Sequence, residues 1–166
     1  MAELRNIIEG RSFTYEGLIS VRTVYREIKG WLDKQDYHPF EENHVEQQLE
    51  SGKEINLVIK GEKELSDTAK INWKSTVVFS NLEPMQVKRH GQVQSMYKGK
   101  IKITTFIRLQ TDYEKTMDQN AFVYFIKVVV DKFVFKSYIN RAVGRIYKQY
   151  GEFEQTVKSF MNMEKF

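Results

Sequence analysis

The sequence predicts an α+β fold, with an antiparallel sheet of about five to seven strands, one helix after the first strand and two long C-terminal helices. Apolar residues alternate with polar residues through much of 12–18 and 55–109, as in strands with one buried face. Apolar residues recur at helical spacing in 21–35 and again beyond residue 122. Strand and helix patterns that are segregated along the chain favour α+β, with the helices packed on one sheet face.

Composition predicts a single domain over residues 1–166. The chain is 41% hydrophobic and 29% charged, values typical of soluble globular proteins. It has no cysteine, which excludes disulfides and thiolate sites. Residues 1–10 lack the apolar stretch of a secretory signal, so we expect a cytoplasmic protein. The net charge of +4 is mild for a dedicated DNA-binding domain.

The first strand and helix are predicted from two neighbouring patterns. Residues 12–18 alternate in the manner of a strand, and Ser20 is a plausible N-cap for the element that follows. One apolar stripe then predicts an amphipathic helix over 21–35. The helix should end before Pro39, because the residue that precedes proline is disfavoured in the α region.

The middle of the chain predicts a series of strands. Residues 38–50 are polar and predict a weak edge strand, and residues 55–59 and 71–79 alternate clearly. The pattern breaks at 81–84, and a hairpin tip is expected near Gly91. The clearest alternation is at 101–109, where Phe106 is the exception on the polar face.

The C-terminal third predicts two helices that meet near Asn140. The stretch 122–139 is mostly apolar, but four charged residues interrupt it, so a membrane span is a poor interpretation. A heptad seam follows at Val143, Ile146, Tyr150, Phe153, Val157 and Phe160.

The helix predicted at 122–139 has a second, narrower apolar ridge. That ridge consists of Tyr124, Val128, Phe135 and Ile139. One interpretation is that the sheet covers the main ridge and the heptad helix covers the second. The other is that a protein partner or a second copy of the chain covers the second ridge or the heptad seam.

The sequence contains no motif that would assign catalytic, cofactor-binding or metal-binding residues. His38 and His44 are six residues apart in a strand-like segment, roughly 20 Å for an extended chain, which is too far to share a metal. Nucleophile-elbow, dinucleotide and P-loop glycine motifs are absent from the sequence. Enzyme activity therefore stays uncertain, with a non-catalytic role favoured.

The polar face of the predicted sheet carries a set of basic residues. These are Lys70, Lys74, Lys100, Lys102 and Arg108. With Phe106 and Tyr97 available for stacking, the set could bind RNA or single-stranded DNA. The alternative is an ordinary solvated face, because three glutamates lie on the neighbouring strand, at Glu54, Glu62 and Glu64.

Several short motifs, in this order, resemble a group of small archaeal proteins without an assigned function. The motifs are residues 15–18, 31–34, 52–55, 98–101 and 112–114. The order of strand, helix, several strands and long terminal helix also loosely resembles the helix-grip fold, in which a sheet wraps a helix over a ligand cavity. The resemblance implies a fold but no activity.

Three functional hypotheses remain from the sequence. The first is a non-catalytic binding or assembly module that uses the C-terminal helices. The second is a helix-grip-like carrier of a small apolar ligand, held between sheet and helix. The third is nucleic-acid binding on the basic sheet face.

Overall fold

The computed structural model describes residues 3–111 and 136–163, together with positions 122, 125, 126, 129, 133 and 134. It confirms the α+β class, with one antiparallel five-stranded sheet. The described elements are β1 (Glu3–Ile19), α1 (Val21–Lys34), β2 (His38–Leu49), β3 (Gly52–Ser66), β4 (Ala69–Arg89), β5 (Gln92–Thr111) and α3 (Lys136–Met163).

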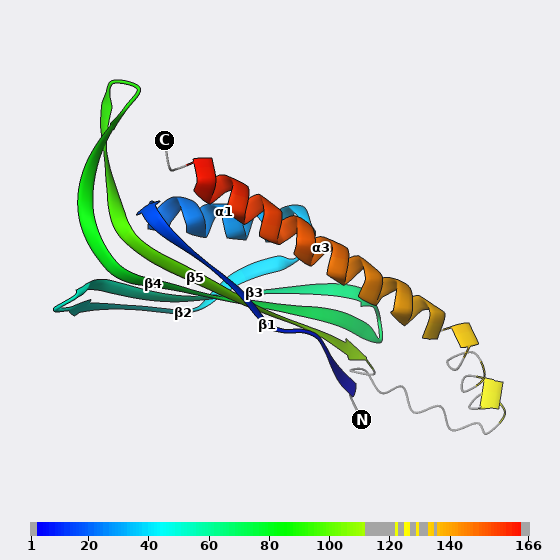
Figure 1. Ribbon diagram of the computed structural model, residues 1–166. Helices are drawn as coiled ribbons and strands as arrows, with labels where there is room; N and C mark the ends of the chain where they lie inside the picture. Colours follow the sequence, from blue (N-terminus) through cyan, green and yellow to red (C-terminus); the bar gives the residue numbers. More distant parts are fainter. Residues whose placement is uncertain are drawn as a thin grey trace.

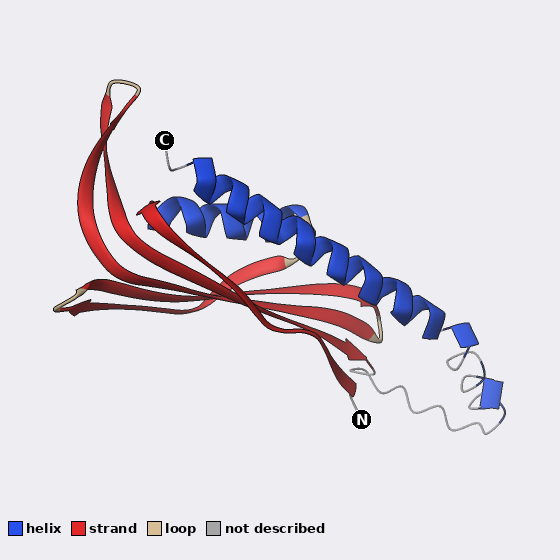
Figure 2. Ribbon diagram, in the orientation of Figure 1, coloured by secondary structure: helices blue, strands red, loops and turns tan. Residues whose placement is uncertain are grey.

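The strand order is β1-β5-β4-β3-β2, so the first strand pairs with the last and the two edges are β1 and β2. Helix α1 connects these two edges. Both α1 and α3 lie on the same side of the sheet (Figures 1 and 2). We call this side the inner face and the opposite side the outer face.

Helix α1 forms as its sequence predicts. The Ser20 side chain accepts a hydrogen bond from the Thr23 backbone N–H at 3.4 Å, which caps the first turn. The apolar stripe faces the sheet, with Val24, Ile28 and Leu32 no more than 2% exposed. Helix α1 therefore contributes one layer of the core.

Helix α3 buries the predicted heptad seam against the inner face. Ile146, Tyr150, Phe153 and Val157 are no more than 2% exposed, and Val143 and Phe160 pack against the same core. This seam is therefore covered by the chain's own sheet. Its polar neighbours anchor the helix further: the Tyr147 hydroxyl donates to the Ile7 carbonyl at 3.2 Å.

An aromatic cluster fills the space between α3, α1 and the sheet. Trp73 from β4 lies 5.2 Å from the ring centroids of both Trp31 and Phe153, and Tyr37 stacks on it edge-on. Trp73 donates its indole N–H to Ser75, so its buried polar atom is satisfied. The carrier hypothesis expects a ligand cavity between the sheet and the terminal helix. A pocket of about 40 Å³, lined by Leu65, Ile71 and Ala142 among others, lies there, and small-molecule sites are typically roughly 300–1,000 Å³.

Two details of the predicted fold are corrected by the structure, and a third lies mostly outside the described residues. The break expected at 81–84 is a β-bulge between Ser80 and Glu83, inside a single strand that continues to Arg89. The joint expected near Asn140 is absent, since α3 runs through this residue. Most of the helix predicted at 122–139 lies outside the described residues, and Ile139 belongs to α3.

Among the described residues, none of the helices is long and apolar enough to cross a membrane.

Candidate functional site

A pocket of about 440 Å³ lies on the inner face, beside the first turns of α1. We call it the α1–β2 pocket. Strand β3 supplies its floor and β2 supplies polar side chains above it. Strand β5 supplies Ser95 and Tyr97, and α1 supplies Val21, Arg22 and Tyr25. Its size falls within the range of small-molecule sites, roughly 300–1,000 Å³.

A β-bulge in β2 determines which side chains enter this pocket. In a regular strand, residues three apart point to opposite faces. The register shifts between Glu41 and Asn43, so Glu41 pairs with Ile59 and His44 pairs with Leu57, both of them buried. The bulge therefore places Glu41 and His44 together on the inner face.

Regular alternation over six residues would place His38 and His44 on one face, and the same bulge places them on opposite faces. His38 pairs with Glu62, which belongs to the outer face, whereas His44 points inward. Within the described part of the chain, no cluster of three or more His, Asp or Glu residues is arranged to hold a metal ion.

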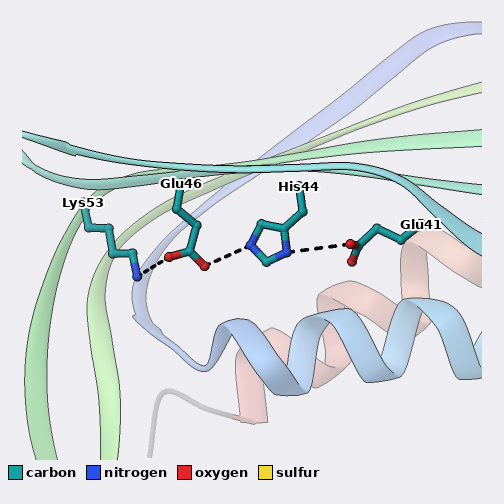
Figure 3. A network of polar contacts seen from close by, with 4 residues as sticks. All are labelled: Glu41, His44, Glu46 and Lys53. Carbon is teal, nitrogen blue, oxygen red and sulfur yellow. Dashed lines mark hydrogen bonds and ion pairs between the residues drawn. The ribbon is translucent and has the colours of Figure 1, made fainter.

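Four polar side chains of the pocket form a chain of contacts (Figure 3). The Lys53 ammonium lies 2.6 Å from Glu46, which lies 2.9 Å from His44 Nε2, and His44 Nδ1 lies 3.8 Å from Glu41. All four side chains point from the strands toward α1 (Figure 3). An imidazole held between two carboxylates can donate or accept a proton and can orient a ligand's hydrogen-bonding group.

Electrostatics within the network are set by Lys53. Its hydrogen bond to Glu46, with a second one from His44, holds the pKa of the Glu46 carboxyl below its usual range. The same hydrogen bond raises the pKa of Lys53. Lys53 also lies 6.0 Å from the Tyr97 ring centroid, which places a cation beside an aromatic wall of the pocket.

The floor of the pocket is apolar. Ile55 and Leu57 are each 2% exposed and belong to the core cluster. An apolar floor beneath a few convergent polar groups is the usual composition of a small-ligand site.

Sequence reasoning missed this site, because residues 38–50 were interpreted as a weak edge strand with solvated acids and histidines. The one signal in the sequence is that Glu41, His44 and Glu46 are all polar. Regular alternation would not place Glu41 on the same face as the other two. The bulge that unites them has no glycine or other sequence marker.

The predicted basic residues do share one face. Lys70 and Lys74 on β4, and Lys100, Lys102 and Arg108 on β5, occupy register positions that alternate with buried inner residues. Acidic neighbours reduce the charge of the set: Lys70 lies 3.4 Å from Glu62, and Lys74 lies 3.8 Å from Glu42.

The predicted partner ridge is described only at one of its four positions. Ile139 is partly buried and packs against the core, whereas Tyr124, Val128 and Phe135 lie outside the described residues. Other apolar side chains of this stretch are exposed. They are Phe122, Phe125, Ile126, Val129, Phe133 and Val134, with exposed fractions between 42% and 73%.

Comparison with models of known protein families finds no match for this chain. A search of curated proteins also finds no significant match. The resemblances noted in the sequence therefore stay predictions.

Proposed function

We propose that the α1–β2 pocket binds a small organic ligand with an apolar body and a hydrogen-bonding head group. The observation that carries the proposal is the row of inward-pointing polar side chains above Ile55 and Leu57. These four side chains are 29–44% exposed, so a ligand can reach them from solvent while its apolar body covers the floor beneath them. A ligand head group that reaches His44 and Glu41 would complete a network that is loose at that end, where the separation is 3.8 Å.

This proposal modifies the carrier hypothesis in two respects. The ligand is amphipathic rather than purely apolar, and it lies beside α1 rather than beneath α3. The helix-grip likeness stays part of the proposal. It is supported by the order of strand, helix, four strands and helix, with the terminal helix lying over the inner face.

The test is ligand detection followed by a matched pair of variants. Native mass spectrometry of protein purified from its host should reveal a bound small molecule, or a fragment library should shift the NMR signals of His44 and Tyr97. His44→Leu should then weaken binding at least tenfold, about 1.4 kcal/mol, because a buried head group loses its partner. His38→Leu, on the outer face of the same strand, should leave affinity unchanged.

Two results would contradict ligand binding in the α1–β2 pocket. No co-purifying molecule and no fragment that shifts these signals would exclude ligand binding in the pocket. Equal effects of the two histidine variants would place the ligand elsewhere.

A second candidate function is assembly through the apolar stretch near residues 122–134. The supporting observation is the exposure of its aromatic side chains: Phe122 is 69% exposed and Phe133 is 73% exposed. Large exposed apolar side chains that are neighbours in sequence commonly mark contact surfaces. If a second copy covers them, the purified chain should self-associate as its concentration rises.

Sedimentation across a hundredfold concentration range tests assembly. Phe122→Ser with Phe133→Ser should return the chain to a monomer. Val93→Ser is the control, because Val93 is 63% exposed but lies at the β4–β5 hairpin tip. A wild-type chain that stays monomeric at the highest concentration contradicts self-assembly.

A further inference from the structure

The outer face carries a row of cations along β5 that is separate from the α1–β2 pocket. Lys100, Lys102 and Arg108 alternate with buried Ile101, Ile103, Ile107 and Leu109, so the three cations point outward together. In the register, Lys102 lies between the uncharged Thr14 and Val78, whereas Lys100 lies opposite Glu16 and Phe106 lies opposite Glu9.

The cations on β5 differ from those on the neighbouring strands. Lys60 and Lys74 both pair with Glu42, and Lys70 pairs with Glu62. Within residues 3–111 and 136–163, none of the three β5 cations makes an ion pair. The positive charge that remains available on the outer face is therefore concentrated on β5.

An exposed aromatic ring lies within this row. Phe106 is 37% exposed, although its position on the outer face is surrounded by polar residues. A bulge in β1 shapes its seat: Gly10 has φ +69°, and a Cβ there would lie 3.1 Å from the Phe106 ring. The Phe106 ring packs directly against the backbone of Gly10, and this contact fixes the position of the ring.

A hollow of about 410 Å³ opens beside Phe106 and spans β1, β5, β4 and β3. Arg108 and Lys74 line it, together with Asn72 and Gln110, which are joined by a hydrogen bond of 3.3 Å. Side-chain amides offer both donors and acceptors, which is what the edges of nucleobases require. The hollow thus combines a stacking ring, amides and cations.

We propose that the outer face binds single-stranded nucleic acid, with a base stacked on Phe106 and phosphates placed along Lys100, Lys102 and Arg108. Exposed aromatics within a cationic track are the usual means of binding single strands. Lys100 and Arg108 are separated by eight residues, roughly 26 Å along a strand, which exceeds one nucleotide and favours a polymer. In a duplex the bases are stacked on one another, so no base would be free to stack on Phe106.

The experiment measures the binding of labelled oligo-dT and labelled oligo-U by fluorescence anisotropy at several salt concentrations. The triple variant Lys100→Gln, Lys102→Gln and Arg108→Gln should bind more weakly, and its logarithmic salt slope should fall by about 2. The control Arg26→Gln, Lys29→Gln and Lys34→Gln removes the same charge from α1 and should preserve the slope.

Phe106→Leu keeps an apolar side chain over Gly10 and separates stacking from charge. It should weaken binding about fivefold or more while leaving the salt slope unchanged. Tighter binding of oligo-U would identify RNA, and equal binding would identify single strands in general; both support the proposal. It is overturned if wild-type protein does not bind either strand at low salt, or if thymidine monophosphate or a duplex binds equally well. Equal effects of the two triple variants also overturn it.

Discussion

Replacing Phe153 with alanine should destabilise the protein more than any change on its surface. The ring is fully buried in α3, and its centroid lies 5.1 Å from Trp31 and 5.2 Å from Trp73. It therefore joins α3 to both α1 and β4. Its removal would leave a cavity where three elements meet.

The expected loss follows from burial and ring contacts. Phenylalanine-to-alanine changes in cores cost about 3–5 kcal/mol, and each favourable ring pair contributes about 0.5–1.5 kcal/mol of stability beyond its buried area. With two close ring partners, we expect a loss of about 4 kcal/mol. For a domain of this length, each kcal/mol lowers the unfolding midpoint by about 2–4 °C.

Intrinsic fluorescence is a direct assay, because both tryptophans of the chain, Trp31 and Trp73, belong to this cluster. Urea unfolding should show a lower midpoint with an unchanged slope. Val93→Ala is the control, since that side chain is 63% exposed at the β4–β5 hairpin tip and its loss should change stability by less than about 0.5 kcal/mol. A loss below about 1 kcal/mol for Phe153→Ala would refute the view that these rings hold the layers together.

Three further predictions concern pH and backbone conformation. Burial raises the pKa of Tyr150 to about 12. The stability that this side chain contributes is therefore fully present below about pH 10, the usual tyrosine pKa, and is lost as the pH rises toward the folded pKa. Between about pH 9 and about pH 11, urea unfolding should show a fall in the free energy of unfolding that is smaller in Tyr150→Phe than in wild type, by about 1 kcal/mol. The pKa of Glu46 is lowered by Lys53, so the stability that it contributes is present above the usual carboxyl range and is lost as pH falls through the folded value. Glu46→Gln should therefore flatten the acid side of the stability profile, and an unchanged profile would contradict the pairing. Gly30→Ala in α1 meets no atom within 4 Å and should stabilise by about 0.5–1 kcal/mol, whereas Gly10→Ala, at φ +69°, should destabilise. Thermal melts of the two variants should move in opposite directions.

The elements with clear periodicity could be predicted from the sequence. The spacing of apolar residues predicts which side chains of α1 and α3 are buried, because each helix buries a single apolar stripe. The Ser20 cap could be predicted from its place just before the α1 stripe. The strand at 101–109 was equally clear, because each inward position is apolar or, at Thr105, hydrogen-bonded to Ser75.

The extent of β4 could not be predicted in the same way. Asn81 has φ +54° and Pro84 lacks a backbone donor, so both residues suggest a turn. Pairing between β3 and β4 ends at Leu82, and beyond it β4 has a neighbour on one side only. Proline is tolerated in such an edge segment, so the strand continues through the bulge.

The α1–β2 pocket was beyond sequence reasoning for a related reason. It depends on a shift of one residue in β2, at Glu42, whose side chain turns outward to Lys60 and Lys74. That shift is a property of strand pairing and curvature, and periodicity alone does not reveal it. The basic outer face needed no such information, because regular alternation already placed its members together.

The strand order has a consequence for how the chain is made. The hairpins that join β2 to β5 pair neighbours in sequence, but β1 finds its partner only in β5, with Glu3 opposite Thr111. During synthesis, β1 leaves the ribosome first and must wait, unpaired, until almost the whole sheet has been translated. Because closing so long a loop is slow, we expect β1 to dock last among the strands. Until then, the edge of β5 that β1 covers is unpaired and open to pairing with other chains.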